Sequence, residues 1–391
     1  MGNTAVTLQK SVNRHTLLPA FLILASLCIA AVLYHYNGYA FFPFLFGFLF
    51  GYTMQRSRFC FAACFRDIFL IRNTTLTRAL LIALTLTTAG FAFVNLVRVS
   101  TGLDISGRMY PLGVHTALGG FLFGLGMVIA GSCVSGCMVR MGEGYLMQYS
   151  TFAGLVLGSL LGAWNLNWWL QGSASVAPVV FLPDHLGWPG ALGLQFTVLA
   201  ALYLLAMKYE GVKDPLAVFR FTDKTKKIWP YGLGAVLLAL GNTGLFALHG
   251  KPWGITSGIT YASGWAVSKL GVGVTSWEYF RTGLFAEQPA AAALLAHPLI
   301  YLALAMVLGS LFSSLLHHEF RIRRARAAKY YYSALAGGTL MGYGSRLSFG
   351  CNIGALLSGT ASLSLHGWLF GFSALAGAAV GGRVLLRYLL D

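Results

Sequence analysis

The chain has 391 residues, of which 57% are hydrophobic and 10% are charged, and its formal net charge is +16. Soluble domains carry about a quarter of charged residues, so this composition excludes a soluble enzyme, a nucleic-acid-binding protein and a disordered chain. Five long windows contain no Asp, Glu, Lys or Arg: 15–55, 109–139, 144–183, 288–318 and 347–382. Because a membrane-spanning helix needs about 20 apolar residues, the sequence predicts an all-α integral membrane protein that crosses the bilayer many times.

Ten apolar segments are predicted to be helices, at 17–36, 39–55, 79–97, 112–131, 148–170, 190–207, 229–248, 291–316, 331–349 and 365–390. The first is too long for a signal-peptide core and has no convincing cleavage site, so we expect it to be retained as an extra span. Four semi-polar segments lie between them, at 58–70, 132–146, 252–269 and 350–364. Irregular backbone is tolerated at membrane depth only inside protein or beside a cavity. We therefore expect about nine to eleven transmembrane helices, with broken or re-entrant helices among them.

Basic residues gather in two short connections between apolar segments. The first connection runs from Lys208 to Lys227, and the second from Arg321 to Lys329. Short basic loops mark the cytoplasmic side, so the positive charge needs no nucleic-acid partner. The chain is expected to comprise an N-terminal half, a basic cytoplasmic linker and a C-terminal half, at 1–210, 211–227 and 228–391.

The two halves share an internal repeat. At an offset of 218 positions six residues are identical, pairing Gly119, Gly120, Gly124, Gly126, Cys133 and Gly136 with Gly337, Gly338, Gly342, Gly344, Cys351 and Gly354. A weaker correspondence relates 46–60 to 243–257, which aligns Cys60 with Ser257. The loop before the first Gly-Gly pair is weakly charged and the loop before the second is strongly basic, which favours inverted repeats.

Five of the six cysteines lie in the semi-polar segments, as Cys60, Cys64, Cys133, Cys137 and Cys351. Cysteines four residues apart share a helix face, so a metal site, a disulfide or a redox pair are alternatives at both C-x₃-C motifs. No histidine stands at ligand spacing, and the second half of the chain has one cysteine. Plain packing is the simplest account of Cys64 and Cys137.

Cys133 and Cys351 differ from the others because they occupy equivalent places in the two repeats. The flanking glycines that let the backbone break there are Gly131, Gly136, Gly350 and Gly354. A helix that starts at mid-membrane exposes free N–H groups and a positive dipole end, and two such ends can hold an anion. Since a thiol is soft and a weak donor, the pattern favours a small sulfur-containing anion. Close packing of Gly and Cys at a helix crossing is the alternative.

Ionisable groups at membrane depth are costly and are usually functional. Arg58, Arg140 and Arg346 lie beside the three cysteine motifs and are expected to attract an anion. Interfacial snorkelling and local pairs such as Arg66–Asp67 or Arg140–Glu143 are the alternatives.

The strings MQRSRFCFAACFRD (54–67), GLGMVIAGSCVSGCMVRMGEG (124–144), WGITS (253–257) and GYGSRLSFGCNIGALLSG (342–359) resemble the YeeE/YedE sulfur-transport family. The resemblance implies inverted repeats around an hourglass constriction, where Cys60, Cys133 and Cys351 contact thiosulfate through S–H···S hydrogen bonds. The sequence departs from the family's Gly-Gly-Cys pattern at Gly131-Ser132-Cys133 and at Phe349-Gly350-Cys351.

The resemblance further implies a transporter of the cell inner membrane that is not an enzyme and takes up thiosulfate or a similar sulfur anion. No cofactor, metal or nucleic acid is expected, and a small cytoplasmic sulfurtransferase is an expected partner. The alternatives are a transporter of a selenium species, a membrane-embedded thiol oxidoreductase or sulfurtransferase, and a membrane subunit that anchors a partner.

Overall fold

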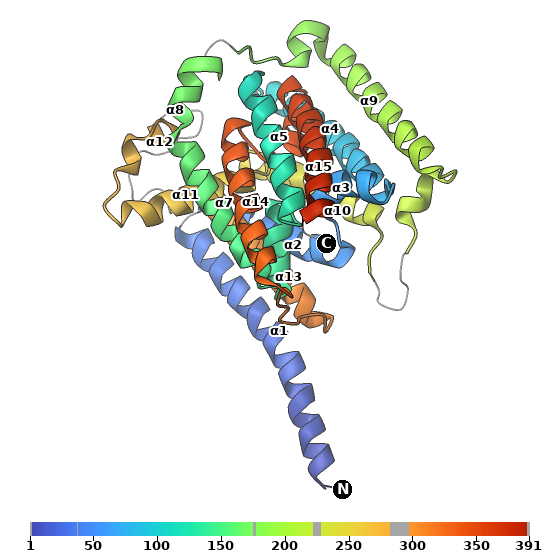
Figure 1. The fold of residues 1–391 in the computed structure, drawn as a ribbon, viewed down its shortest axis with the longest axis vertical. Helices are drawn as coiled ribbons and strands as arrows, with labels where there is room; N and C mark the ends of the chain where they lie inside the picture. The colour runs from blue at the N-terminus through green and yellow to red at the C-terminus, as the bar shows by residue number, and fades with distance from the viewer. Residues whose placement is uncertain (1, 37, 175–176, 222–227, 282–296, 389–391) are drawn as a thin grey trace.

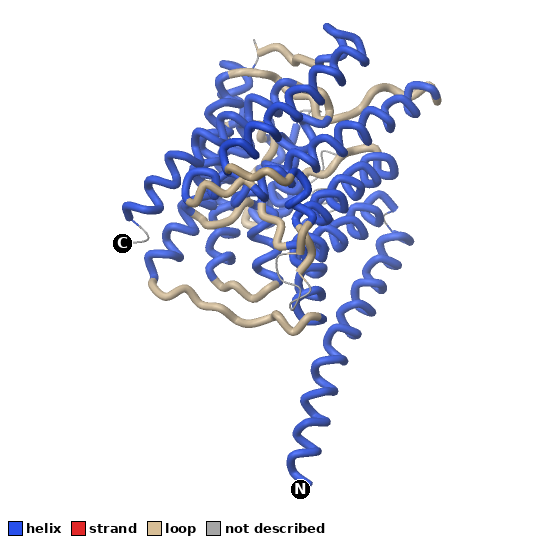
Figure 2. Tube along the Cα trace, turned by 90° about the vertical axis from the view of Figure 1, so that its right-hand side faces the viewer, coloured by secondary structure: helices blue, strands red, loops and turns tan. Residues whose placement is uncertain are grey.

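The computed structural model describes residues 2–36, 38–174, 177–221, 228–281 and 297–388 (Figure 1). This part of the chain is helical, and its backbone pairing outside helices is limited to isolated bridges (Figure 2). The predicted all-α architecture is confirmed. Residues 222–227 of the expected basic linker lie outside the described residues.

The helices of the N-terminal half are α1 (Gly2–Tyr36), α2 (Gly38–Ser57), α3 (Phe61–Leu70), α4 (Thr75–Ser100), α5 (Val114–Ile129), α6 (Val134–Gly142), α7 (Met147–Trp164), α8 (Leu166–Trp169), η1 (Leu170–Ala174) and α9 (Leu182–Glu210). Those that follow are η2 (Pro215–Phe219), α10 (Tyr231–His249), α11 (Ile255–Ser268), η3 (Val274–Ser276), α12 (Glu278–Arg281), α13 (Pro298–Leu316), α14 (Ala328–Leu347), η5 (Asn352–Gly359) and α15 (Leu365–Tyr388).

Seven helical segments among the described residues are long and apolar enough to cross a membrane: α1 from Leu18, α4, α5 together with α6, α9, α10, α13 and α15. Helices α2, α7 and α14 have 20, 18 and 20 residues and pack against these segments. The chain is therefore a multi-pass membrane protein, and the number of crossings stays a prediction.

The centre of the bundle is a close crossing of α5 and α14 (Figure 1). A Cβ atom added to Gly126 would lie 2.5 Å from the carbonyl oxygen of Gly337, and one added to Gly337 would lie 2.6 Å from that of Gly126. Gly119 and Gly344 face each other in the same way, at 2.6 and 2.5 Å. Backbones approach this closely in membranes only where both helices carry small residues.

This crossing has the symmetry of an inverted repeat. At the offset of 218, Gly119 and Gly126 correspond to Gly337 and Gly344, yet in space Gly119 meets Gly344 and Gly126 meets Gly337. The two equivalent helices therefore run antiparallel, as a two-fold axis in the membrane plane requires. The flanking helices repeat the relation, since α7 packs on α14 as α15 packs on α5. The geometry supports the predicted inverted repeat.

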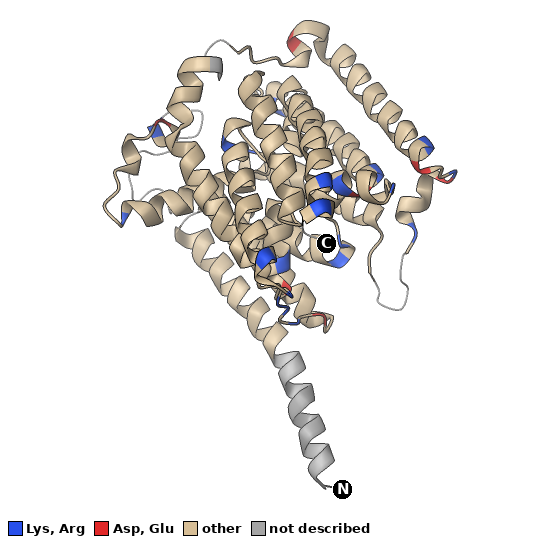
Figure 3. Ribbon diagram, viewed as in Figure 1, with Lys and Arg blue, Asp and Glu red and all other residues tan. Residues whose placement is uncertain are grey.

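The two basic connections lie at the same end of the bundle, which we call the basic end. The backbone N–H of Trp229, just after the linker, donates to the carbonyl of Arg56 at 3.1 Å. The guanidinium of Arg56 lies 3.5 Å from the carboxylate of Glu319, which follows α13. Figure 3 shows basic residues, coloured blue, near the lower end of α13 and α14. Both basic connections thus converge on the C-terminal end of α2.

Helix α4 runs from the basic end to the opposite end of the bundle, which we call the far end. Its first turn lies at the basic end, because Arg78 pairs with Glu210 at the end of α9, where the first basic connection begins. The distance between Nη2 and Oε2 is 3.1 Å. The helix then runs for 26 residues to Ser100, a length of about 39 Å at 1.5 Å per residue. The loop 101–113 that follows therefore lies at the far end.

We predict that Gly126→Ala destabilises the bundle by about 1–3 kcal/mol, because the added methyl group forces α5 and α14 apart. The matched control is Gly193→Ala in α9, where a Cβ atom would meet nothing within 4 Å. It should be neutral or slightly stabilising, since alanine favours helix. The measurement is the temperature at which each variant aggregates in detergent, and equal values for the two would contradict the crossing.

Candidate functional site

In the described part of the chain, four helices begin inside the bundle after a break in the preceding helix. The residues at these starts are Cys60 before α3, Cys133 before α6, Gly254 before α11 and Cys351 before η5. All four have extended backbone conformations. The weaker sequence correspondence aligned Cys60 with Ser257, whereas the structure places the helix start three residues earlier, at Gly254. The four semi-polar segments are thus the broken helices that the sequence predicted.

The three cysteine-bearing breaks share one backbone feature. The residue two positions before each cysteine has a positive φ: 54° at Arg58, 71° at Gly131 and 53° at Phe349. This left-handed conformation costs little at glycine and is uncommon for a bulky residue. Phe349 is held by its ring, which stacks on Tyr110 at a centroid distance of 5.3 Å. The departure from Gly-Gly-Cys therefore preserves the break.

Cys60 and Cys133 come together at Gly136. A Cβ atom added to Gly136 would lie 3.5 Å from the sulfur of Cys133 and 3.7 Å from the sulfur of Cys60. Both thiols thus lie beside the same glycine, and the sulfur of Cys133 accepts the backbone N–H of Gly136 at 3.4 Å. The bare glycine therefore leaves room for both sulfur atoms at the start of α6.

Cys351 is 2% exposed and occupies the equivalent place at the start of η5. Its sulfur forms no hydrogen bond to Cys60 or Cys133 among the described residues. The next side chain, Asn352, donates to the sulfur of Met127 in α5 at 3.4 Å, so this helix start faces the central crossing. The structure therefore places two of the three predicted cysteines beside the same glycine, Gly136, and the third on the other repeat.

Cys64 and Cys137 have different surroundings. The thiol of Cys64 donates to the carbonyls of Cys60 and Leu76 at 3.3 and 3.4 Å, and that of Cys137 donates to the carbonyl of Gln148 at 3.2 Å. All six cysteines of the chain are free thiols in this structure. Within the described ranges no three His, Cys, Asp or Glu residues form a cluster that could hold a metal. The backbone hydrogen bonds support the packing role of these two thiols.

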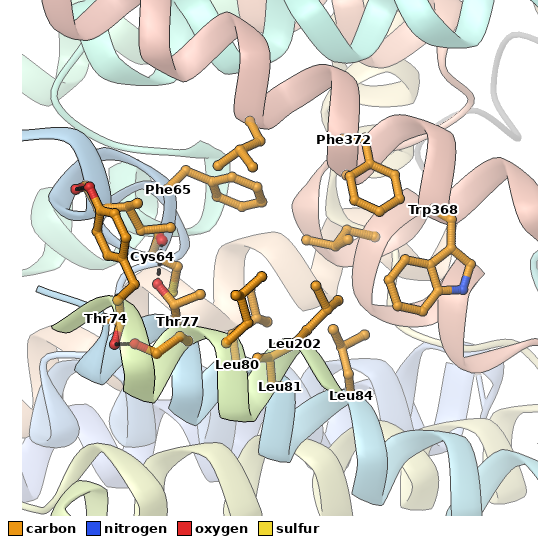
Figure 4. Close-up of a pocket in the computed structure, with 17 residues that line it drawn as sticks. Cys64, Phe65, Thr74, Thr77, Leu80, Leu81, Leu84, Leu202, Trp368 and Phe372 are labelled. Atoms are coloured by element: carbon orange, nitrogen blue, oxygen red, sulfur yellow. Dashed lines mark hydrogen bonds between the residues drawn. The ribbon is translucent and has the colours of Figure 1, made fainter. Parts of the chain in front are cut away.

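A groove behind Cys64 has the wrong chemistry for an anion. It has a volume of about 360 Å³ and lies between α3, α4, α9 and α15 (Figure 4). Its walls are leucine and aromatic side chains, including Leu80, Leu202 and Phe372, with the hydroxyls of Thr74 and Thr77 at one side. Both threonine hydroxyls donate within the protein, to Glu210 and to the carbonyl of Cys64. The groove is therefore suited to apolar groups.

Two of the predicted supporting arginines stabilise the breaks. Arg140 donates to the carbonyl of Gly131 at 2.9 Å, which satisfies the backbone just before Cys133. Arg346 is 3% exposed and donates to the hydroxyl of Tyr279 at 2.5 Å. Its Nε has no hydrogen-bond partner. A buried cation whose hydrogen bonds go to neutral groups raises the local potential and favours an anion nearby.

Arg58 forms ion pairs with two segments at the basic end. Its two terminal nitrogens pair with Glu143 at 2.9 Å and with Glu319 at 2.6 Å. The amide of Gln55 donates to the same two carboxylates, at 3.3 and 2.7 Å. This network links the first break to the end of α6 and to the loop after α13. We call it the ionic latch.

The ionic latch differs from the local pair Arg140–Glu143 that the sequence allowed, and it adds Glu319 to the residues of the site. Arg66 and Asp67 do pair, at 2.8 Å, but Glu143 pairs with Arg58, and Arg140 reaches Gly131 instead. Glu319 was not a candidate from the sequence, because it lies 261 residues from Arg58. The one available signal was its position as an acid beside a strongly basic stretch.

A protein-family model described as sulphur transport matches residues 56–380, a range that includes all four breaks. The thiosulfate transporter TsuA of Escherichia coli (strain K12) is 30% identical over 350 residues, which cover 83% of this chain and 88% of the relative. TsuA of Spirochaeta thermophila is 31% identical over 366 residues, covering 88% and 98%. The probable transporter YedE of Escherichia coli is 29% identical over 167 residues, covering 42% and 40%.

We predict that Glu319→Gln exposes Cys60, because it removes the charge that two arginines share at the ionic latch. A loss of about 1 kcal/mol corresponds to about a fivefold increase in the open population. The measurement is the rate at which a water-soluble methanethiosulfonate labels Cys60 in permeabilised membrane vesicles, where the reagent reaches both faces of the membrane. Asp67→Asn is the matched control, since it breaks only the local pair with Arg66. Equal labelling rates in the two variants would rule out a closing role for the latch.

Proposed function

Because the chain belongs to the sulphur-transport family, we propose that it carries thiosulfate, or a closely similar sulfur anion, across the cell inner membrane. The proposed path runs past the thiols at the starts of its broken helices. Two relatives that match most of the chain are named thiosulfate transporters. Their names support transport, without bond breaking, as the activity.

The observation that carries this proposal is the coincidence of a thiol with a helix start at three places. Each start presents N–H groups that lack carbonyl partners, and together they attract negative charge. The thiols of Cys60 and Cys351 cap no backbone N–H in the described structure. They can donate instead to the terminal sulfur of thiosulfate, a soft acceptor that water solvates less strongly than it solvates an oxyanion.

The same residues account for the order of events. The basic end carries both basic connections, so by the positive-inside rule it faces the cytoplasm. Cys60 lies next to the ionic latch at that end, and Cys133 lies beside it. The ion is proposed to pass from Cys351 to the Cys133–Cys60 pair and to leave through the latch. A small cytoplasmic sulfurtransferase is the proposed recipient of the cargo.

An oxidoreductase or sulfurtransferase working through the C-x₃-C pairs is the second candidate. It requires Cys64 or Cys137 to face the same space as its partner thiol. Both donate to backbone carbonyls instead, and this favours transport. A selenium-containing anion of the same shape would meet the same thiols, so competition experiments decide between the two cargoes.

We predict that Cys351→Ala abolishes uptake of labelled thiosulfate in cells that lack other sulfate and thiosulfate importers. The reason is that alanine removes the one thiol at the start of η5. Cys64→Ala is the matched control, a cysteine of equal burial that packs outside the proposed path, and it should retain at least half of wild-type uptake. Retained uptake with Cys351→Ala, or equal loss in both, would contradict the thiol path.

A further inference from the structure

The loop 101–113 at the far end folds back into the bundle and inserts one arginine. The backbone N–H of Arg108 donates to Ser362 at 3.0 Å, and Ser106 donates to the carbonyl of Gly250 at 3.2 Å. These bonds hold the loop against the break between α10 and α11. The side chain of Arg108 is 8% exposed, although the loop connects two surface ends of helices.

The guanidinium of Arg108 fills the place of a missing side chain. Gly254 starts α11 in the way that the three cysteines start their helices, and a Cβ atom added there would overlap Nη2 and Cζ of Arg108. On the other side, a Cβ atom added to Gly354 would lie 3.8 Å from Nη1. The guanidinium therefore lies between two helix starts.

The pseudo-two-fold relation between the repeats shows which group at the basic end corresponds to the guanidinium of Arg108. Gly354 is the repeat equivalent of Gly136, and Gly136 is the glycine that faces the sulfur of Cys60. Gly354 faces Arg108 in its place. At the far end the guanidinium thus occupies the position that the Cys60 thiol occupies at the basic end.

The hydrogen bonds of Arg108 leave its charge uncompensated. Nη2 donates to the carbonyl of Pro252 at 3.2 Å, and Nη1 to the hydroxyl of Tyr110 at 3.4 Å. Nε is buried and has no hydrogen-bond partner. Among the described residues no carboxylate forms an ion pair with it, whereas Arg58 at the basic end pairs with two. A buried charge without a counter-ion is costly unless an anion completes the site.

We propose that Arg108 and the start of α11 form the entry site for the transported anion, on the far side of Cys351. This inference rests on the proposed function. A guanidinium fork binds oxygen atoms in pairs, so Arg108 takes the oxygens of thiosulfate while its terminal sulfur points onward. Gly354 lies one helical turn from Cys351, which makes transfer to that thiol a short step.

Because Arg108 binds oxygen atoms and the thiols bind sulfur, the two groups are expected to select different anions. Arg108 binds any small tetrahedral dianion through its oxygens, whereas the thiols require a terminal sulfur. Sulfate is therefore expected to occupy the entry site and to compete with thiosulfate without being carried.

The test compares Arg108→Gln with Arg98→Gln, its matched control. Arg98 lies at the same end of the bundle and donates to the carbonyl of Asp104 at an exposed position. Arg108→Gln should raise the KM for thiosulfate uptake at least tenfold, keep Vmax within twofold, and abolish inhibition by sulfate. Arg98→Gln should change KM less than twofold. An unchanged KM and unchanged sulfate inhibition in folded Arg108→Gln would overturn the proposal.

Two further variants keep the test decisive if Arg108→Gln does not fold. Arg108→Lys retains the charge and should rescue most of the loss in KM, and Gly254→Ala retains Arg108 but displaces its guanidinium and should raise KM. Failure of both expectations in folded protein would overturn the entry site. If the wild type carries no thiosulfate, binding of labelled sulfate to purified wild-type and Arg108→Gln protein tests Arg108 separately. Equal binding would then count against it.

Discussion

A helix that begins inside a membrane leaves its first backbone N–H groups without carbonyl partners, and lipid offers them none. Among the residues that the structure describes, four helices begin in that way, at Cys60, Cys133, Gly254 and Cys351. Their starts must therefore lie within protein and close to something that accepts hydrogen bonds. Burial in the centre of the bundle meets the first requirement, and in the proposed function a passing anion meets the second.

The glycine crossing of α5 and α14 brings the helix starts of the two repeats together. Because equivalent glycines meet in reverse order, the repeats are related by an axis in the membrane plane. The inverted relation places the two breaks of the N-terminal half toward the basic end and the two breaks of the C-terminal half toward the far end, so the starts are distributed along the membrane normal. Thiols occupy three of these starts, and a guanidinium fills the fourth. The same symmetry that positions the starts also allows the two ends to carry different chemistry.

Much of this arrangement could be predicted from the sequence, because its signals are local or periodic. Charge-free windows predict the spans, and the offset of 218 predicts that Cys133 and Cys351 start equivalent helices. Long-range contacts had no such signal. The partners of Arg58 come from two distant segments. Arg108 lies in a short loop between apolar segments, and its sequence alone predicts an exposed position. The fourth helix start was misaligned by three residues because glycine has no side chain to mark it.

The most direct test of the central claim is to locate the ion at the helix starts. Selenosulfate replaces the terminal sulfur of thiosulfate with selenium, whose anomalous scattering identifies it in crystals of the protein. The account predicts a selenium peak within hydrogen-bonding distance of the sulfur of Cys351 or of the Cys133–Cys60 pair. It also predicts that the peak is lost in Cys351→Ala crystals if it lies at that residue. A selenium peak elsewhere in the bundle, with none beside these thiols, would contradict the account.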